Sequence, residues 1–488
     1  LRALKAMGAS DAGYLVPNRF EYGYGLTEKI VAVAAERSPA LILTVDNGVS
    51  SIEGVAAARS RGIKVLVTDH HLPGEALPAA DAIVNPNLPG DAFPSKNLAG
   101  VGVVFYIMAA LRRSLRQAGW FAQRGIPEPK LAEHLDLVAL GTVADVVPLD
   151  ANNRIMVEQG VRRIRAGQAK AGIHALLKIG GRDHRRVVSA DLGFAVAPRL
   201  NAAGRLSDMS LGIECLLTDE DERALTMAQE LDALNRERRE IERQMKDEAL
   251  TILAEFEQGE NGMSLPCGIC VYERQWHQGV IGILAARLKD RYQRPVIAFA
   301  DGSNDGELRG SARSIAGVHV RDVLDRVATA HPGLISKFGG HAGAAGLSLP
   351  HDHLETFRHA FDAAVREVVT AEQLDGKLIS DGELKDEHIC IEVAELLRAA
   401  APWGQGFPEP VFDGVFEIVG QRVIGEVHRK LVVKREGQRG TVEALMFNAD
   451  SFGWRESDKH VRIAFRLDVN DYQGYRTPQL VVVHIEPA

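Results

Sequence analysis

The chain has 488 residues, of which 46% are hydrophobic, and a formal net charge of −8; these values exclude a disordered polypeptide and a protein that binds nucleic acid through its overall charge. The length predicts about three domains. No stretch is apolar enough to span a bilayer, no secretory leader opens the chain, and four cysteines indicate a reducing compartment, so we expect a cytoplasmic protein. Because Leu1 begins a segment of helical character, we expect further residues upstream of this numbering.

From residue 31 to about residue 149, helix-like segments alternate with short apolar runs, a pattern that predicts βαβ units and a parallel sheet. Two of these runs, LILTV and VLVT, are typical of buried strands. Asp46 follows the first strand, and Asp69, His70 and His71 follow the second. Because open α/β sheets bind ligands at the carboxyl ends of their strands, these side chains should gather at one edge.

A third apolar run, LGTVADVVPL, contributes Asp145. Carboxylate oxygens beside imidazole nitrogens, without a cysteine cluster, favour Mn²⁺ or Mg²⁺ over Zn²⁺. Each acid also has a structural alternative, because Asp46 suits a turn or a helix cap and Asp145 could be a buried structural acid. Two adjacent histidines after an acid favour a metal site over a packed core.

Residues 154–205 hold eleven Lys or Arg against three acids, a local charge that suits a phosphate-binding surface. This segment ends in APRLNAAGRL, which carries Arg199, Asn201 and Arg205. Nearer the start, Arg19 lies among tyrosines in VPNRFEYGYG. Arginine beside aromatic rings suits single-stranded nucleic acid, although a surface salt bridge is its commoner role.

Residues 219 to about 256 contain no Gly or Pro and space their apolar side chains three to four residues apart, which predicts one long helix. At 1.5 Å per residue this helix could reach ~50 Å and bridge two domains. A helical hairpin is the ordinary alternative, but the segment offers no turn residues for it.

A second α/β region follows and is expected to end near residue 369. Its expected elements are strands at 268–272 and 295–300 and a helix at 279–291. Cys267 and Cys270 form a CxxC in the first strand, where residues three apart face opposite sides, so we interpret both as structural.

This region contains two glycine-rich segments, GSARS and FGGHAGAAGL, which we interpret as loops that approach an anion. Ser311 and Arg313 in the first segment suit a terminal phosphate, because Arg donates two hydrogen bonds and Ser adds one. His341 in the second segment is either a donor to phosphate or a structural histidine.

The last part, from about residue 376, alternates Val-rich strands with glycine-containing turns and predicts a small all-β barrel. An oligonucleotide-binding (OB) fold is one such barrel, and aromatic residues beside Lys and Arg could stack on bases. The candidates are Phe416, Phe447, Tyr472 and Tyr475. Many barrels bind no nucleic acid, so this pattern alone is a weak signal.

In chain order, DNG, TDHH, GTVADVVPL, PRLNAAGR, GSARS and GGHA resemble the motifs of the DHH phosphoesterases, and most closely those of its bacterial single-stranded-DNA-specific exonucleases. The resemblance extends over essentially the whole chain, including PNRFEYGYGL, WHQGVIGILAARL and WGQGFPEPVFDG. It implies an α/β fold class: a parallel-sheet DHH domain, a long connecting helix, a smaller α/β DHHA1 domain and a C-terminal all-β OB-like barrel. The corresponding ranges are 1–215, 216–258, 259–369 and 370–488.

The same resemblance implies a metal site. Its ligands would be Asp46, His70 and Asp145. His71 would face the scissile phosphate, with Asp69 supporting the histidines from behind. The family's first motif, a strand that ends in paired aspartates and supplies further ligands, does not occur in these residues.

It also implies contacts to the substrate. Arg205, Ser311 and Arg313 would hold the 5′ phosphate. Other candidates for the DNA phosphates and bases are Arg19, Arg199, Asn201, His341 and Tyr24, the last as a stacking residue.

The implied activity is 5′-to-3′ hydrolysis of single-stranded DNA to 5′-mononucleotides with two divalent ions, Mn²⁺ or Mg²⁺, in DNA repair and recombination. Implied partners are single-stranded DNA, a single-strand-binding protein and a helicase at the bacterial nucleoid; no membrane is involved and a monomer is expected. Two alternatives remain open. One is a DHH hydrolase of small phosphate substrates such as oligonucleotides, cyclic dinucleotides or pyrophosphate, and the other is a catalytically impaired DNA-binding scaffold.

Overall fold

The computed structural model describes the chain except for residues 17–21, 23–24, 259–264, 303–305, 426–427, 438–439, 448, 450–456 and 473–474. Arg19 and Tyr24, both predicted to contact substrate, lie outside the described residues. The chain divides into two compact units: unit 1 comprises Leu1–Asp232 with Ser380–Ala488, and unit 2 comprises Ala233–Ile379. Among the helices that are described, none has the length and apolarity needed to cross a membrane.

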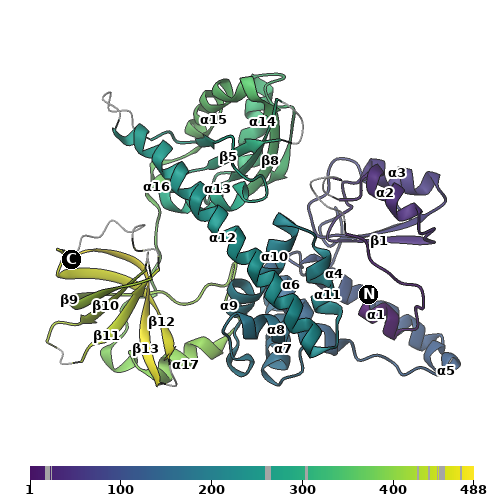
Figure 1. Ribbon diagram of the computed structural model, residues 1–488, viewed down its shortest axis with the longest axis horizontal. Coiled ribbons are helices and arrows are strands. Elements are labelled where there is room, and N and C mark those ends of the chain that lie inside the picture. Colours follow the sequence, from purple (N-terminus) through teal and green to yellow (C-terminus); the bar gives the residue numbers. More distant parts are fainter. Residues whose placement is uncertain are drawn as a thin grey trace. The chain divides into compact units, whose positions relative to one another are not determined.

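The first part of unit 1 contains a three-stranded parallel sheet, which confirms the predicted βαβ pattern (Figure 1). Its strands, in the order β1-β2-β3, are β1 (Leu41–Val45), β2 (Lys64–Thr68) and β3 (Ala82–Val84), with α2 (Glu28–Ala35) and α3 (Ile52–Ser60) before and after β1. Val31, Val55, Val65 and Val67 form a buried core between the two helices and the sheet. Since Val45 pairs with Thr68, β1 and β2 end at the same edge.

Helices form the rest of the N-terminal portion of unit 1. They are α1 (Arg2–Ala6), α4 (Gly100–Gln117), α5 (Trp120–Arg124), α6 (Leu135–Ala144), α7 (Ala151–Arg165), α8 (Ala171–Ile179), α9 (Ser189–Asp191), α10 (Ala197–Leu206) and α11 (Ser210–Leu217), with the 3-10 turns η1 (Leu131–His134) and η2 (His184–Arg186) and the π-helical turn η3 (Leu192–Val196). The third apolar run of the sequence is therefore the buried helix α6, and Asp145 caps its C-terminus.

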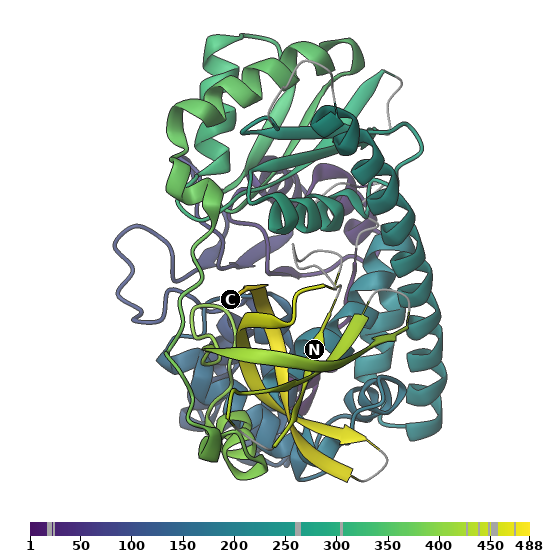
Figure 2. The same ribbon diagram turned by 90° about the vertical axis from the view of Figure 1, so that its left-hand side faces the viewer.

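The predicted long helix is confirmed as α12 (Asp221–Gln258), a single helix of 38 residues and not a hairpin (Figure 2). Its length corresponds to roughly 57 Å. Charged pairs one turn apart stabilise it, as between Arg238 and Glu242 at 2.8 Å. The division between the two units falls within this helix, after Asp232.

Unit 2 contains a five-stranded mixed sheet in the order β4-β5-β6-β8-β7. The strands are β4 (Ile269–Tyr272), β5 (Val296–Asp301), β6 (Glu307–Arg313), β7 (Lys337–His341) and β8 (Ala344–Pro350), and the helices are α13 (Ile281–Tyr292), α14 (Val320–Ala330), η4 (His351–His353), α15 (Leu354–Val368) and α16 (Ala371–Asp375). Helices α14 and α15 build the buried core on one face of the sheet with Phe299 and Leu347. Helix α13 packs against β5 and β6.

The prediction that GSARS and FGGHAGAAGL are loops is wrong, because the first lies largely in β6 and the second forms the β7–β8 hairpin. Gly310 serves the packing of the sheet core. A Cβ atom on Gly310 would lie 2.5 Å from Cε1 of Phe299 and 2.7 Å from Cδ2 of Leu347, so only glycine fits beside these core side chains.

The C-terminal part of unit 1 is a closed five-stranded barrel in the order β10-β11-β13-β12-β9, which confirms the predicted OB-like fold. Its strands are β9 (Phe412–Ile424), β10 (His428–Lys434), β11 (Val442–Met446), β12 (His460–Tyr472) and β13 (Tyr475–Pro487), preceded by η5 (Asp386–His388) and α17 (Ile391–Ala400). The prediction that Phe416 could stack on bases is wrong. Barrel closure buries its ring among core residues, with its centre 5.9 Å from that of the Phe465 ring. Phe447 and Tyr475 are exposed, whereas the side chain of Tyr472 lies outside the described residues.

Candidate metal centre and phosphate site

Asp46 is held in a rare backbone conformation at the end of β1. Its φ of 65° is unusual for a residue other than glycine, and its N–H donates to the carbonyl of Thr68 at 3.0 Å. Helix α4 begins directly against it, since a Cβ on Gly100 would lie only 2.6 Å from the Asp46 Cβ. Glycine therefore lets the positive end of a helix dipole approach this carboxylate.

His70 lies between two carboxylates that come from distant parts of the sequence. Its Nε2 is 2.9 Å from Oδ1 of Asp46 and 3.3 Å from Oδ2 of Asp145. Burial alone would lower the pKa of His70, but the hydrogen bond with Asp46 and the charge of Asp145 outweigh it and raise the pKa. Burial, and then the negative charge of Asp46, raise the pKa of Asp145. This cluster of negative charge favours a bound cation.

Asp69 is a buried carboxylate behind the two histidines. Its Oδ1 accepts hydrogen bonds from the N–H groups of His70 and His71 and from Nδ1 of the His71 ring at 2.7 Å, and its Oδ2 accepts from the N–H of Val49. Burial would raise the pKa of Asp69, but the hydrogen bonds from His71 and the main chain outweigh it and lower the pKa. The hydrogen bond to Asp69 raises the pKa of His71. Asp69 thus fixes the orientation of the His71 ring.

Sequence reasoning missed two asparagines that hold the same loop. Asn85 is 1% exposed and donates from Nδ2 to the carbonyl of His71 at 2.8 Å, while Asn87 donates to the carbonyl of His70 at 2.6 Å. Both belong to an Asn-Pro-Asn sequence directly after β3, which by itself resembles an ordinary turn. Its position after a third parallel strand was the available signal.

The geometry fits a divalent cation with oxygen and nitrogen ligands. One ligand atom each from Asp46, His70 and His71 lie within 4.8 Å of one another, and Asp145 adds a further carboxylate beside His70. Octahedral ligands about 2.1 Å from an ion are about 3 Å apart, close to the observed separations around His70 Nε2. Hard carboxylate oxygens with imidazole suit Mn²⁺ or Mg²⁺.

In unit 2, the strand register brings Ser311, Arg313 and His341 to one face of the sheet. Arg313 pairs with Ala344 of β8, and Ala344 pairs with His341 of β7, so Arg313, Ala344 and His341 form one row across the sheet. Ser311 lies two residues before Arg313 on the same face. Directly paired residues point to the same face, which places Arg313 and His341 about 10 Å apart with only a methyl group between them. Arg313 Nη1 also donates to Oγ of Ser311 at 3.2 Å.

The first turn of α13 lies against this face. A Cβ on Gly282 would be 2.9 Å from Oγ of Ser311 and 3.0 Å from Nη2 of Arg313, so the glycine permits the close approach. Burial lowers the pKa of the Arg313 guanidinium, but the group stays charged at neutral pH. A helix N-terminus, a hydroxyl and a guanidinium together suit a phosphate group.

His341, at the end of β7, is exposed, and its Nδ1 accepts a hydrogen bond from the N–H of Gly343 at 3.2 Å. A neutral ring in this arrangement carries its proton on Nε2, which can donate to a phosphate.

The three remaining candidates lie on α10 in unit 1. Arg199 is 9% exposed and its guanidinium forms an ion pair with Asp232 of α12 at 2.8 Å, so it joins the two helices. Asn201 is exposed and Arg205 is half-buried. The predicted phosphate residues of this motif are therefore in different environments, and Arg199 faces the protein interior.

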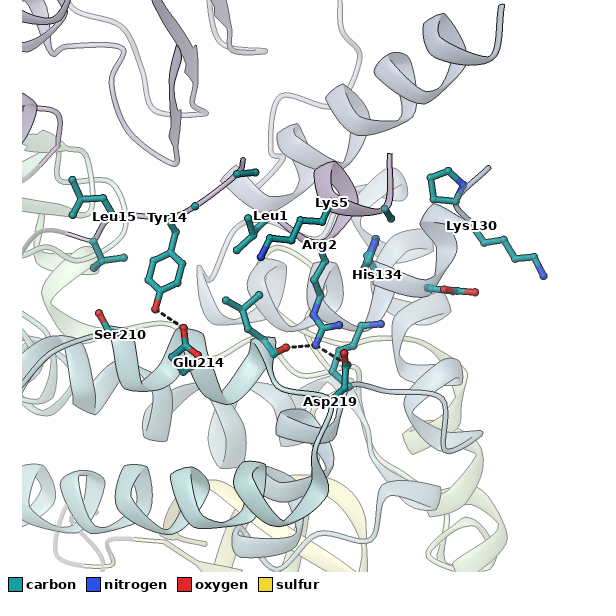
Figure 3. A pocket seen from close by; sticks show the side chains of 18 of the residues that line it. Leu1, Arg2, Lys5, Tyr14, Leu15, Lys130, His134, Ser210, Glu214 and Asp219 are labelled. Carbon is teal, nitrogen blue, oxygen red and sulfur yellow. Dashed lines mark hydrogen bonds and ion pairs between the residues drawn. The ribbon is translucent and has the colours of Figure 1, made fainter. Parts of the chain in front are cut away.

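A separate pocket of about 1170 Å³ lies in unit 1 and is lined by none of the described candidate residues (Figure 3). At its rim Arg2 binds Asp219 at 2.8 Å, and the hydroxyl of Tyr14 donates to Glu214 at 2.7 Å. Because none of Asp46, His70, His71 and Asp145 lines this pocket, it is not part of the candidate metal centre.

Comparison with protein families accounts for all three parts of the architecture. Residues 1–142 match the model of the DHH family N-terminal domain, residues 266–367 that of the DHHA1 domain, and residues 380–484 that of the RecJ OB domain. Fold and site thus define a DHH-family protein with a DHHA1 domain and an OB barrel.

Among curated relatives, the single-stranded-DNA-specific exonuclease RecJ of Dickeya dadantii is 56% identical over 486 residues, which are 99% of this chain and 84% of that protein. The chain therefore belongs to the RecJ family. A crystal structure of RecJ from Thermus thermophilus in complex with Mn²⁺ superposes with a TM-score of 0.78 at 27% identity, covering 100% of this chain and 66% of that one. The Mg²⁺ complex of RecJ from the same organism shares the fold, with a TM-score of 0.67 at 23% identity over 99% of this chain and 72% of that one.

Proposed function

We propose that this protein is a metal-dependent exonuclease that hydrolyses single-stranded DNA from the 5′ end to 5′-mononucleotides, in DNA repair and recombination. Its family relatives are single-stranded-DNA-specific exonucleases, and RecJ of Thermus thermophilus binds Mn²⁺ and Mg²⁺. The observation that carries the proposal is the convergence of Asp46, His70 and Asp145, with His70 Nε2 2.9 Å and 3.3 Å from the two carboxylates.

Asp46, His70 and Asp145 would hold a divalent ion, Mn²⁺ or Mg²⁺, as part of a two-ion site. When bound, divalent ions supply a strong nucleophile at neutral pH and neutralise the charge that gathers on the phosphate oxygens. Asp69 holds Nδ1 of His71, so that Nε2 is the ring atom that meets the scissile phosphate. A His71 ring protonated on both nitrogens would keep its hydrogen bond to Asp69 through Nδ1 and donate from Nε2 to the developing oxyanion.

Ser311, Arg313 and the first turn of α13 bind the terminal 5′ phosphate, with Arg205 as a further contact. His341 donates to a neighbouring phosphate through Nε2. Asn201 and Arg19 extend the contacts to the backbone of the strand, and Tyr24 stacks on a base. Binding the terminal phosphate would fix the 5′ end of the strand, as the release of one nucleotide in each cycle requires.

The test is hydrolysis of a long 5′-phosphorylated single strand, of the matching duplex and of a dinucleotide, each with Mn²⁺. We expect mononucleotides from the single strand, much slower cleavage of the duplex, and complete loss of activity when a chelator removes the metal. Preference for the dinucleotide would instead favour a hydrolase of small phosphate substrates. DNA binding without hydrolysis would favour the scaffold alternative.

The proposal extends to partners. A single-strand-binding protein and a helicase would supply the single strand at the bacterial nucleoid, and the protein would act as a monomer. Co-sedimentation with purified single-strand-binding protein, and the molar mass in solution, test these two points.

A further inference from the structure

The sequence WGQGF, residues 403–407, forms a turn that lies directly on the loop after Asp145. The N–H of Leu149 donates to the carbonyl of Gln405 at 2.7 Å. A Cβ on Gly404 would lie 2.7 Å from Cδ1 of Leu149, and one on Gly406, whose φ is +69°, would lie 3.2 Å from Cβ of Pro148. The two glycines therefore permit a main-chain approach that other residues would obstruct.

Arg154 of α7 contacts both the turn and the loop after Asp145. Its Nη1 donates to the carbonyl of Leu149 at 2.8 Å, and its guanidinium lies 4.3 Å from the centre of the Phe407 ring. Phe407 in turn stacks on Trp403 with ring centres 5.1 Å apart. A planar guanidinium can stack on the ring while an N–H at its edge donates to the carbonyl, a geometry that the compact ammonium group of Lys does not reproduce.

The loop between Asp145 and Leu149 needs such support. Val146 has a φ of 58°, a strained conformation for a β-branched residue, and is 64% exposed. Strain of this kind persists only where the surrounding structure holds it. Leu149, three residues further on, is 3% exposed and is the buried point of the loop.

The turn forms hydrogen bonds with both the segment that packs on the barrel and the helical part of unit 1. Nε1 of Trp403 donates to the carbonyl of Leu397 in α17, and Leu397 packs against the core of the barrel. Oγ of Ser189 donates to the carbonyl of Trp403 at 2.8 Å. Gly404 and Phe407 exchange main-chain hydrogen bonds that close the turn. A continuous set of contacts thus joins the barrel to Pro148 and Leu149, at the end of the loop that follows Asp145.

We propose that the 403–407 turn is a positioning clamp for Asp145: it holds the strained loop 146–149 and thereby sets the place of this carboxylate at the metal centre. The clamp residues do not touch the metal or the substrate and act only through Asp145. The inference rests on the proposed role of Asp145 as a metal ligand. If the proposal is correct, the metal affinity of the DHH domain depends on the 403–407 turn, which directly precedes the barrel in the sequence.

The experiment measures Mn²⁺ binding to the full chain by electron paramagnetic resonance of free Mn²⁺, a readout that needs no turnover. Arg154→Lys keeps the charge but loses the fork and the stacking, and Gly406→Ala strains the turn. We expect both to weaken Mn²⁺ binding by about tenfold, the effect of removing an outer support of a metal ligand. Asp471→Asn is the matched control. Asp471 of β12 forms an ion pair with Arg186, so it also links the barrel to the helical part of unit 1, but the pair does not include the turn. The Mn²⁺ affinity of this variant should equal that of wild type.

Circular dichroism establishes whether each variant is folded. If Gly406→Ala does not fold, the Mn²⁺ affinity of Arg154→Lys alone tests the proposal. Wild-type Mn²⁺ affinity in a folded Arg154→Lys variant would overturn the clamp, as would an equal loss in Asp471→Asn, which would mean that any loosening of the barrel has the same effect. Failure of the unaltered chain to bind Mn²⁺ would instead contradict the proposed function.

Discussion

The proposed metal centre and the proposed phosphate site are built on opposite physical principles. The metal centre gathers titratable groups at the ends of parallel strands and at a helix terminus, with positive φ at both Asp46 and Val146. The phosphate site uses regular antiparallel strands to present the permanent charge of Arg313 beside Ser311 and a helix N-terminus. The first region therefore combines backbone strain with a negative charge that a cation would neutralise, whereas the second presents a permanent positive charge that is complementary to an anion without titration. We infer that the first performs the chemistry and the second sets the register of the strand.

Removing a ligand from the metal centre should have the largest effect. Asp46→Asn keeps the size of the side chain but removes the charge that faces His70, and we expect the rate of hydrolysis to fall by about a thousandfold or more, equivalent to several kcal/mol of transition-state stabilisation. DNA binding, measured by fluorescence anisotropy without metal, should remain within about twofold of wild type. Wild-type turnover in Asp46→Asn would remove this residue from the site.

A substitution in the phosphate site should weaken substrate binding and leave the rate of the hydrolysis step unchanged. Arg313→Lys removes the planar fork beside Ser311, so we expect KM for 5′-phosphorylated single strands to rise by about 10- to 100-fold, the value of one or two charged hydrogen bonds. The turnover number at saturation should change little. A strand with a 5′ hydroxyl is the matched control, because it lacks the group that Arg313 binds and should be cleaved equally by both proteins. An equal loss on both substrates would contradict the assignment.

The sequence predicted the elements whose patterns are local and missed the features that depend on tertiary contacts. The strands before Asp46 and Asp69 and the long helix α12 follow from hydrophobic periodicity, and the structure confirms them. GSARS was misassigned because the reason for Gly310 is the ring of Phe299 on the neighbouring strand, which no local pattern reveals. Phe416 was misassigned because its burial depends on closure of the barrel.

The candidate site shows the same limit. The acids and histidines of the metal centre carry a recognisable composition, and their residues could be proposed from the sequence. Asn85 and Asn87 could not, since their role lies in hydrogen bonds to main-chain carbonyls of His70 and His71. The 403–407 turn likewise contacts residues more than 250 positions earlier in the chain, at Leu149.

The pH dependence of Mn²⁺ binding should distinguish the metal centre from the phosphate site. We expect an effect of intermediate size. Because Asp46 and Asp145 raise the pKa of His70 against the opposing effect of burial, this ring is protonated at a higher pH than an ordinary histidine. A proton on Nε2 competes with the metal, so Mn²⁺ affinity should fall as the pH decreases, by up to about tenfold per pH unit for each proton displaced. Calorimetric titrations at several pH values measure this slope. Arg313→Lys should give the same slope as wild type, and a difference would mean that the two sites are coupled.

The smallest expected effect comes from the outer layer of the metal centre. Asn87→Ala removes the hydrogen bond to the carbonyl of His70 and a second one to the carbonyl of Lys96, at 2.6 Å and 3.1 Å. We expect the free energy of unfolding to fall by about 1–2 kcal/mol and Mn²⁺ affinity to fall a few-fold, because the loop keeps its buried Asp69 but loses one of its supports. Asn152→Ala is the control, since it breaks only an exposed hydrogen bond with Tyr106 and should change stability by less than about 0.5 kcal/mol. If Asn87→Ala lowers stability without weakening Mn²⁺ binding, the asparagine supports the fold alone and the loop around His70 is held by Asp69.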